Sequence, residues 1–206
     1  VWSVRQDGSD LQSHMWGWDF TVHPAGHISG ITRGGIPFVY DPATDDQVFV
    51  RDWGMIYRAF FSPTGAAFLA EVAGALVLVD WREGEERVLL PTRRAAPRQH
   101  GMFAHRALEI SWHPDETGFA FTSGWDGDDD IGYYDLATGE VRRLTEEPWD
   151  EQGPSFSPDG RYLAYMYHDP IGSHVCILDL TEETALKATW RVSRRAWIVW
   201  RPRGQG

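Results

Sequence analysis

Cysteine and lysine are almost absent from this chain, which contains one of each among its 206 residues. Because Cys176 has no partner in the chain, no intrachain disulfide can form. Its place in the apolar run 174–178 predicts that it acts as a small buried hydrophobe. Apolar stretches are also far shorter than the eighteen or so residues of a membrane helix, so no membrane span is expected. No apolar signal segment opens the chain, which starts at Val1, and we expect that residues upstream of it have been removed.

Positive charge is scarce as well, with 19 Lys and Arg against 30 Asp and Glu and a formal net charge of −11. Binding to a polyphosphate depends on cationic groups that displace counterions, so nucleic acid is not an expected partner. The sequence has no G-x-S-x-G nucleophile elbow, which argues against a peptidase-type hydrolase domain. It also has no phosphate-binding glycine loop and no dinucleotide fingerprint.

A short proline turn recurs along the chain, each time after an apolar or aromatic stretch. Proline presets the first corner of a tight turn, and Asp, Thr or Gly tolerate the second. The turn prolines lie 39, 51, 44 and 44 residues apart, which indicates a repeat of roughly 44 residues. The five turns are His23–Gly26, Ser62–Gly65, His113–Glu116, Ser157–Gly160 and Arg201–Gly204.

The same order of segments follows four of these turns. A second strand comes first, and a third strand then ends in an aspartate that can start the next turn by bonding its own backbone. The proline-to-aspartate distances are 17, 17, 21 and 21 residues, so the length varies in the loop between the second and third strands. Short strands at even spacing, with no helical periodicity, indicate an all-β chain. The four aspartates are Asp41, Asp80, Asp135 and Asp179.

One such unit cannot bury both faces of its sheet, whereas a ring of units can, so we predict a β-propeller of about five four-stranded blades. A linear β-solenoid is the competing arrangement. The predicted blades cover roughly residues 17–53, 54–92, 93–147 and 148–190, and a composite fifth blade joins residues 191–206 to residues 1–16. That last blade lacks its second strand, so the chain is either a ring with an imperfect blade or a part of a larger propeller.

The repeats resemble those of the TolB-type propellers over most of residues 17 to 204. The likeness is clearest at Ser155–Tyr165, with its Ser-Pro-Asp-Gly turn, and nearly as clear at Ala120–Thr145. The turn His113–Glu116 departs from the pattern because it lacks the usual glycine. The resemblance implies a propeller fold and favours a periplasmic or secreted location. Proteins with this repeat include protein-binding scaffolds, the propeller domains of prolyl-oligopeptidase-type peptidases, and oligogalacturonate lyases, so a shared fold does not assign the function.

Candidate binding residues lie in the loops that lead into each first strand and in the loops between second and third strands. In a propeller these loops form one face of the disc. Tryptophans flanked by acids and histidines suit a sugar- or peptide-binding face, although large aromatics also pack between blades. The candidates are Trp18, Asp19, Trp53, Tyr57, His100, His105, Glu109, Trp125, Asp126, Trp149, Asp150, Glu151, Gln152, His168, Arg195 and Trp197.

Two metal hypotheses arise from these residues. His100, His105 and His168 have no counterpart in the repeat and, with Gln152, are candidate ligands for a divalent metal, although their spacing matches no metal motif. The resemblance to oligogalacturonate lyases implies a histidine-rich metal centre on the same face. The acidic run Trp125–Asp130 invites a calcium interpretation, but it lacks the twelve-residue loop with a closing glutamate, so an exposed acidic hairpin tip is favoured.

The leading hypothesis is a non-catalytic binding propeller that presents an aromatic and acidic face to a protein, peptide or oligosaccharide. The alternative is a small carbohydrate-active enzyme, such as a metal-dependent protein similar to oligogalacturonate lyases. Paired carboxylates for glycoside hydrolysis could come from Asp19, Glu109, Asp150 and Glu151, whose separations the sequence does not give. A third possibility is a structural module of a longer protein.

Overall fold

The computed structural model describes residues 2–3, 12–13, 17–23, 26–41, 43–49, 56, 58–72, 74–91, 109–125, 128–182, 184–192, 198 and 200, of which residues 2–19, 49, 125 and 184–191 are described by their backbone alone. These residues form strands and turns without any helix, which confirms the predicted all-β class for this part of the chain. It follows that they include no helix long and apolar enough to cross a membrane.

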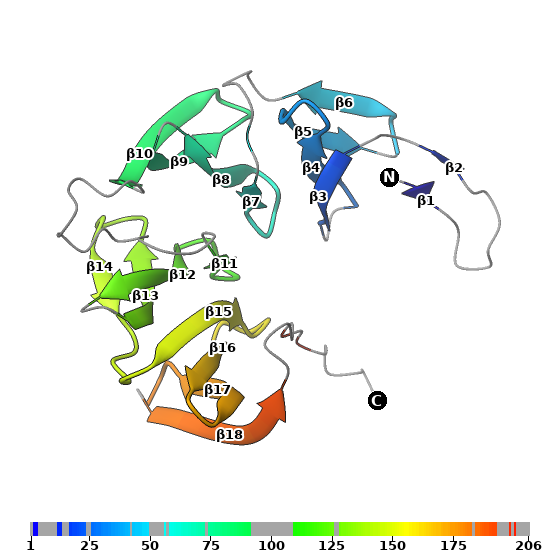
Figure 1. Ribbon diagram of the computed structural model, residues 1–206. Coiled ribbons are helices and arrows are strands. Elements are labelled where there is room, and N and C mark those ends of the chain that lie inside the picture. Colours follow the sequence, from blue (N-terminus) through cyan, green and yellow to red (C-terminus); the bar gives the residue numbers. More distant parts are fainter. Residues whose placement is uncertain are drawn as a thin grey trace. The chain divides into compact units, whose positions relative to one another are not determined.

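The strands form four sheets of four strands each, and each sheet is an antiparallel meander in chain order (Figure 1). We refer to these sheets as blades. Blade 1 contains β3 (Gly17–Val22), β4 (Ile28–Thr32), β5 (Pro37–Asp41) and β6 (Asp46–Phe49). Blade 2 contains β7 (Ala59–Phe61), β8 (Ala67–Val72), β9 (Ala75–Asp80) and β10 (Glu85–Pro91). Blade 3 contains β11 (Ile110–Trp112), β12 (Gly118–Trp125), β13 (Asp128–Asp135) and β14 (Val141–Arg143). Blade 4 contains β15 (Asp150–Phe156), β16 (Tyr162–Asp169), β17 (Gly172–Asp179) and β18 (Thr184–Val192).

The chain divides into two units, Val1–Leu90 with blades 1 and 2, and Pro91–Gly206 with blades 3 and 4. A further two-stranded sheet pairs β1 (Trp2–Ser3) with β2 (Gln12–Ser13). Most of residues 193–206, which the sequence assigns to a composite fifth blade, lie outside the described residues. The composite blade therefore stays a prediction.

The recurring turn joins the first and second strands of every blade and has one hydrogen-bond pattern. The backbone N–H of its fourth residue donates to the carbonyl of its first residue, at 2.8 to 2.9 Å in all four blades. The fourth residue has a positive φ each time, at Gly26, Gly65, Glu116 and Gly160. Only glycine adopts this conformation without a steric cost from its side chain, which explains the glycine of the motif.

The aspartate that ends each third strand caps the turn that follows it. Its carboxylate accepts the backbone N–H two residues later, at 2.8 to 3.0 Å, in all four blades. These bonds confirm the turn-starting role that the sequence predicts for the four aspartates. In blade 4, the Thr181 hydroxyl and the Arg161 guanidinium also donate to Asp179, and these bonds lower the pKa of Asp179 to about 2.

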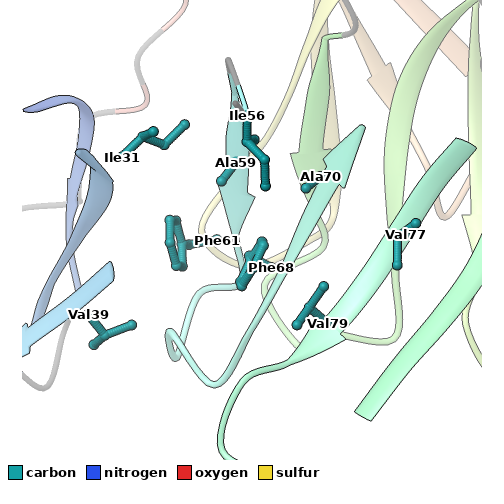
Figure 2. Packing of buried hydrophobic residues seen from close by; sticks show 9 residues of the cluster. All are labelled: Ile31, Val39, Ile56, Ala59, Phe61, Phe68, Ala70, Val77 and Val79. Carbon is teal, nitrogen blue, oxygen red and sulfur yellow. The ribbon is translucent and has the colours of Figure 1, made fainter. Parts of the chain in front are cut away.

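The core of the first unit lies between blades 1 and 2. Ile31 of β4 and Val39 of β5 extend toward blade 2, where Phe61 and Phe68 meet them in one buried cluster (Figure 2). Phe61 and Phe68 have ring centroids 5.1 Å apart. Every second residue of a strand contributes to this cluster, because successive side chains of a strand point to opposite faces of its sheet.

The core of the second unit joins blades 3 and 4 in the same way. Ala120 and Ile131 of blade 3 pack with Phe156, Leu163 and Tyr165 of blade 4. Cys176 belongs to this cluster and is 1% exposed, which confirms the small buried hydrophobe that the sequence predicts.

A histidine turn of one blade packs against a glycine turn of the next blade in both units. A Cβ added at Gly160 would lie 2.5 Å from His113 Nε2, and one added at Gly65 would lie 3.0 Å from His23 Cδ2. The His113 ring is held by Asp115 and by an edge contact with Phe156, whose centroid is 4.9 Å away. The sequence shows these histidines only as turn residues, whereas the structure makes them contacts between neighbouring blades.

We predict that Gly160→Ala destabilises the protein more than Gly84→Ala does. Both glycines have a φ near +73°, so both substitutions carry about 1 kcal/mol of backbone strain. A Cβ at Gly84 meets nothing within 4 Å, whereas one at Gly160 meets the His113 ring, which adds about 1–3 kcal/mol. Urea unfolding of both variants measures the difference. In the background of His113→Ala the extra cost at Gly160 should disappear, and its persistence would contradict the packing explanation.

We also predict that Glu116→Gly stabilises the protein relative to Glu116→Ala by about 1 kcal/mol. Glu116 has a φ of 62° where the other three turns have glycine. Alanine removes the side chain and keeps the strained backbone, so the comparison isolates the conformational cost. Equal unfolding free energies for the two variants would show that this turn does not adopt the left-handed conformation.

Candidate functional site

Loops and hairpins of blades 3 and 4 gather at one edge of the second unit. We call it the hairpin edge and define it by Glu109, the β12–β13 and β16–β17 hairpins, and the segment Glu146–Gln152 that leads into β15. Trp125 pairs with Asp128 at the end of one hairpin, and Asp150 pairs with His168 near the end of the other. Hydrogen bonds from Gln152 to Asp129 and from Asp129 to Asp150 join the two blades here. The proline turns lie at the other end of the same strands.

The hairpin edge holds six of the predicted site residues whose side chains are described. Trp149 is 43% exposed, Gln152 is buried, and Glu109, Asp150 and His168 are half-buried. Glu151 is fully buried. Trp125 lies there by its backbone, and Trp18 and Asp19 belong to β3 of the other unit, also by backbone alone. The remaining candidates lie outside the described residues: Trp53, Tyr57, His100, His105, Asp126, Arg195 and Trp197.

Glu109 ties blade 3 to blade 4. Its carboxylate accepts the backbone N–H of Gly153 at 2.6 Å and the Thr122 hydroxyl at 3.3 Å. Gly153 has a φ of 63° and lies where β15 loses its regular register with β16. Such a bulge directs a backbone N–H away from the hydrogen bonds between the strands. Here the Gly153 N–H donates to the Glu109 carboxylate of blade 3 instead.

A second tie joins the β12–β13 hairpin to the first residues of β15. The Gln152 amide donates to Asp129 Oδ2 at 2.6 Å, and the Asp129 N–H donates to Asp150 Oδ1 at 3.3 Å. The donors in these bonds are an amide group and a backbone N–H, both neutral. The carboxylates are thus fixed in position across the two blades.

Glu151 is directed away from the surface and lies with a second buried acid, Asp130. Both side chains are 0% exposed, and Asp130 Oδ2 accepts Arg143 Nη2 at 2.9 Å. Neither carboxylate oxygen of Glu151 has a hydrogen-bond donor among the described residues. The Thr145 hydroxyl lies close to the Glu151 carboxylate but does not form a well-aligned hydrogen bond with it. The Thr145 hydroxyl oxygen accepts the Ile131 N–H at 2.9 Å.

Burial raises the pKa of Glu151 to about 7. The negative charges of Asp130 and Glu147 act in the same direction, while Thr145 and Arg143 favour the ionised form and only partly offset the burial. The protonated form of Glu151 is therefore the form that suits its surroundings, because a buried carboxylate without donors is costly when it is charged.

His168 is held by its own hairpin. Its Nδ1 lies 2.8 Å from the Ser173 hydroxyl, and Ser173 is buried. Next to it, His174 Nε2 lies 3.5 Å from Asp169 Oδ2. No group of three His, Cys, Asp or Glu side chains within the described residues is arranged to hold a metal ion. The predicted metal ligands His100 and His105 lie outside the described part of the chain.

The acidic run that ends at Asp130 is not the uniformly exposed hairpin tip that the sequence predicts. Asp128 is exposed, Asp129 is half-buried and Asp130 is fully buried. The run continues into β13, where successive side chains point to opposite faces of the sheet. Burial increases from Asp128 to Asp130 as the strand enters the blade.

The sequence pattern marks Asp129 and Asp130 only as part of an acidic run, and it does not mark Arg143 or Ser173. In the structure Asp129 bonds Gln152, Ser173 bonds His168, and Arg143 bonds Asp130, which lies with Glu151. A detectable signal was the strand register, because Asp129 and Asp130 fall where a third strand begins. Pairings between blades, such as Gln152 with Asp129, have no sequence signal.

Four-stranded antiparallel meanders with this repeat define a TolB-like β-propeller fold, as the resemblance in sequence predicted. The structure of TolB from Acinetobacter baumannii is similar to this chain, with a TM-score of 0.66 and 21% identity over 91% of the present chain and 48% of that chain. A protein assigned as TolB from Agrobacterium tumefaciens has a TM-score of 0.63 and 18% identity over 87% of this chain and 64% of its own. The present chain thus spans about half to two thirds of these similar structures.

Other β-propellers are similar at lower identity. The β-propeller domain of Cps50 (Swd1) from Myceliophthora thermophila has a TM-score of 0.57 and 13% identity, and the match covers 89% of this chain and 59% of that chain. No protein-family model matches the chain, and no curated protein matches it. At these identities the likeness establishes the fold alone.

We predict that Glu151→Gln removes a loss of stability that the natural chain shows as the pH rises from about 4.5 to about 7. The folded-state pKa of about 7 lies above the ordinary value of 4.5, so the protonated folded state is favoured at low pH and that contribution is lost as the pH rises through about 7. The loss amounts to at most about 3 kcal/mol. The free energy of unfolding of the natural chain should be lower at pH 8.5 than at pH 5.5. The difference between these two pH values should be smaller for Glu151→Gln.

Glu146→Gln is the matched control, because Glu146 lies in the same segment and its side chain is 77% exposed. This variant should follow the natural chain at both pH values. If Glu151→Gln also follows the natural chain, Glu151 ionises as an ordinary exposed glutamate and the burial described above is wrong.

Proposed function

We propose that this protein is a non-catalytic binding propeller, which presents an aromatic and acidic face to a protein, peptide or glycan ligand. The hairpin edge is the part of that face within the described residues. The likeness to TolB structures supports a propeller framework for it, and the ligand is inferred from the residues alone.

The observation that carries the proposal is that polar groups at the hairpin edge are fixed before any ligand arrives. Glu109, Asp129, Asp150 and Gln152 are bonded across two blades, next to a tryptophan that is 43% exposed. A site whose side chains are already ordered loses less conformational entropy when it binds. Exposed tryptophan supplies a large contact area with few rotatable bonds.

The proline-turn edge of the same blades is a contrasting surface. There, the carboxylates of Asp135 and Asp179 accept the N–H groups of their own turns. The described side chains with exposed large apolar surface in this unit, Trp149 and Ile171, belong to the hairpin edge instead. The ligand surface is therefore assigned to the hairpin edge.

The bonding of the described acids and histidine suits a scaffold better than a catalyst. The Glu109 carboxylate is engaged by Gly153 and Thr122, and His168 by Ser173. A general acid or base must reach a proton on the substrate, and these groups bond neighbouring residues instead. The carbohydrate-active alternative depends on His100, His105 and His168 beside Gln152, and of these His100 and His105 lie outside the described residues.

We predict that Trp149→Ala weakens ligand binding at least about tenfold, because truncation of a central aromatic residue commonly costs 1–2 kcal/mol or more. The natural chain would be screened against a peptide library and a glycan array, and each hit measured by calorimetry. Glu140→Gln, at the opposite edge of blade 3, is the control and should bind normally. Hits that bind Trp149→Ala as tightly as the natural chain would reject the hairpin edge as the ligand surface.

A further inference from the structure

Two large apolar side chains are exposed in the described part of the second unit. Ile171 is 71% exposed and Trp149 is 43% exposed. A single exposed apolar residue is ordinary, whereas two at one edge suggest an interaction site. Neither residue is required by the turn chemistry of the repeat.

Strand register brings the two residues to the same edge. Trp149 directly precedes Asp150, which pairs with His168 of β16, and Ile171 lies in the turn that follows β16. That turn is fixed, because Asp169 Oδ1 accepts the N–H groups of both Ile171 and Gly172 at 2.8 Å. Ile171 is thus held outward by a capped turn.

Carboxylates lie at the same edge as these two apolar residues. Asp128 and Glu146 are exposed, and Asp150 accepts the N–H of Asp129 beside Asp128. Arg143, which precedes this edge in the chain, lies 2.9 Å from the buried Asp130 and 3.9 Å from Glu146, and the backbone of Arg191 pairs with His174 of β17. Acids outnumber bases here, as they do in the whole chain, with its net charge of −11.

We propose that the hairpin edge binds a polypeptide segment in which arginine or lysine alternates with aliphatic residues. This inference rests on the proposed function and names the chemistry of its ligand. Aliphatic side chains would pack on Trp149 and Ile171, while cationic groups would lie by Asp128, Glu146 and Asp150. An isoleucine offers no flat face for a sugar ring, and the carboxylates repel acidic glycans and nucleic acids, so charge and shape both favour a cationic peptide.

The probe is a short synthetic peptide in which arginine and leucine alternate, measured against the full chain by fluorescence anisotropy. Comparison peptides replace every arginine by glutamate, or every leucine by serine. We expect the arginine–leucine peptide to bind at least about tenfold more tightly than either comparison. Its affinity should also fall as salt is raised from 50 to about 300 mM, because exposed charges are screened over shorter distances.

Matched variants test the location. Ile171→Ser and Asp128→Asn should each weaken the arginine–leucine peptide severalfold or more. Val88→Ser and Glu140→Gln should not, although Val88 is 69% exposed and Glu140 is exposed. All four residues are at the surface, and circular dichroism of each variant checks that the fold is retained.

The outcomes separate this inference from the proposed function. Equal binding of the glutamate peptide, or equal loss in the Val88 and Glu140 variants, overturns the inference because binding is then unselective or elsewhere. If a glycan or a neutral peptide binds and is lost in Trp149→Ala, the proposed function stands and the cationic partner is wrong. If no ligand of any class depends on Trp149, both are rejected.

Discussion

Every blade of this protein depends on a neighbour, because a four-stranded sheet has two apolar faces and cannot bury both alone. The consequence is visible in each unit. Blades 1 and 2 share one cluster around Phe61 and Phe68, and blades 3 and 4 share another around Phe156 and Tyr165. Where two blades meet at their proline turns, a histidine ring fills the space that a glycine of the next blade leaves open. The spacing of blades is therefore set by packing as well as by the sheets themselves.

The same dependence creates the candidate site. At the hairpin edge, blades 3 and 4 are joined by polar contacts, among them Glu109 with Gly153 and Gln152 with Asp129. These contacts fix side chains at the edge that we propose binds the ligand. Structural and proposed binding roles thus coincide in the same residues, so a substitution at Glu109 would affect both. Trp149, Ile171 and Asp128 are better probes of binding, because exposed side chains contribute little to the core.

Buried charge is the most costly feature of this unit. Asp130 has an arginine partner, whereas Glu151 is buried without a donor among the described residues and holds its proton to an unusually high pH. The two residues do not differ in local sequence, since both are acids in short acidic runs. Burial follows from strand alternation and depends on which neighbour covers each position.

The repeat determined the fold by itself. Regular proline turns, strand-ending aspartates and the absence of helical periodicity specify antiparallel blades, because these are local properties of turns and strands. The edge where function would lie also follows from chain order, which is how Glu109, Trp149, Asp150 and His168 could be predicted together. Tertiary structure alone decided which acids are exposed and which are buried, which residues bond across blades, and that Ile171 is held at the surface of the same edge as Trp149. These depend on contacts between residues far apart in sequence, which no local pattern encodes.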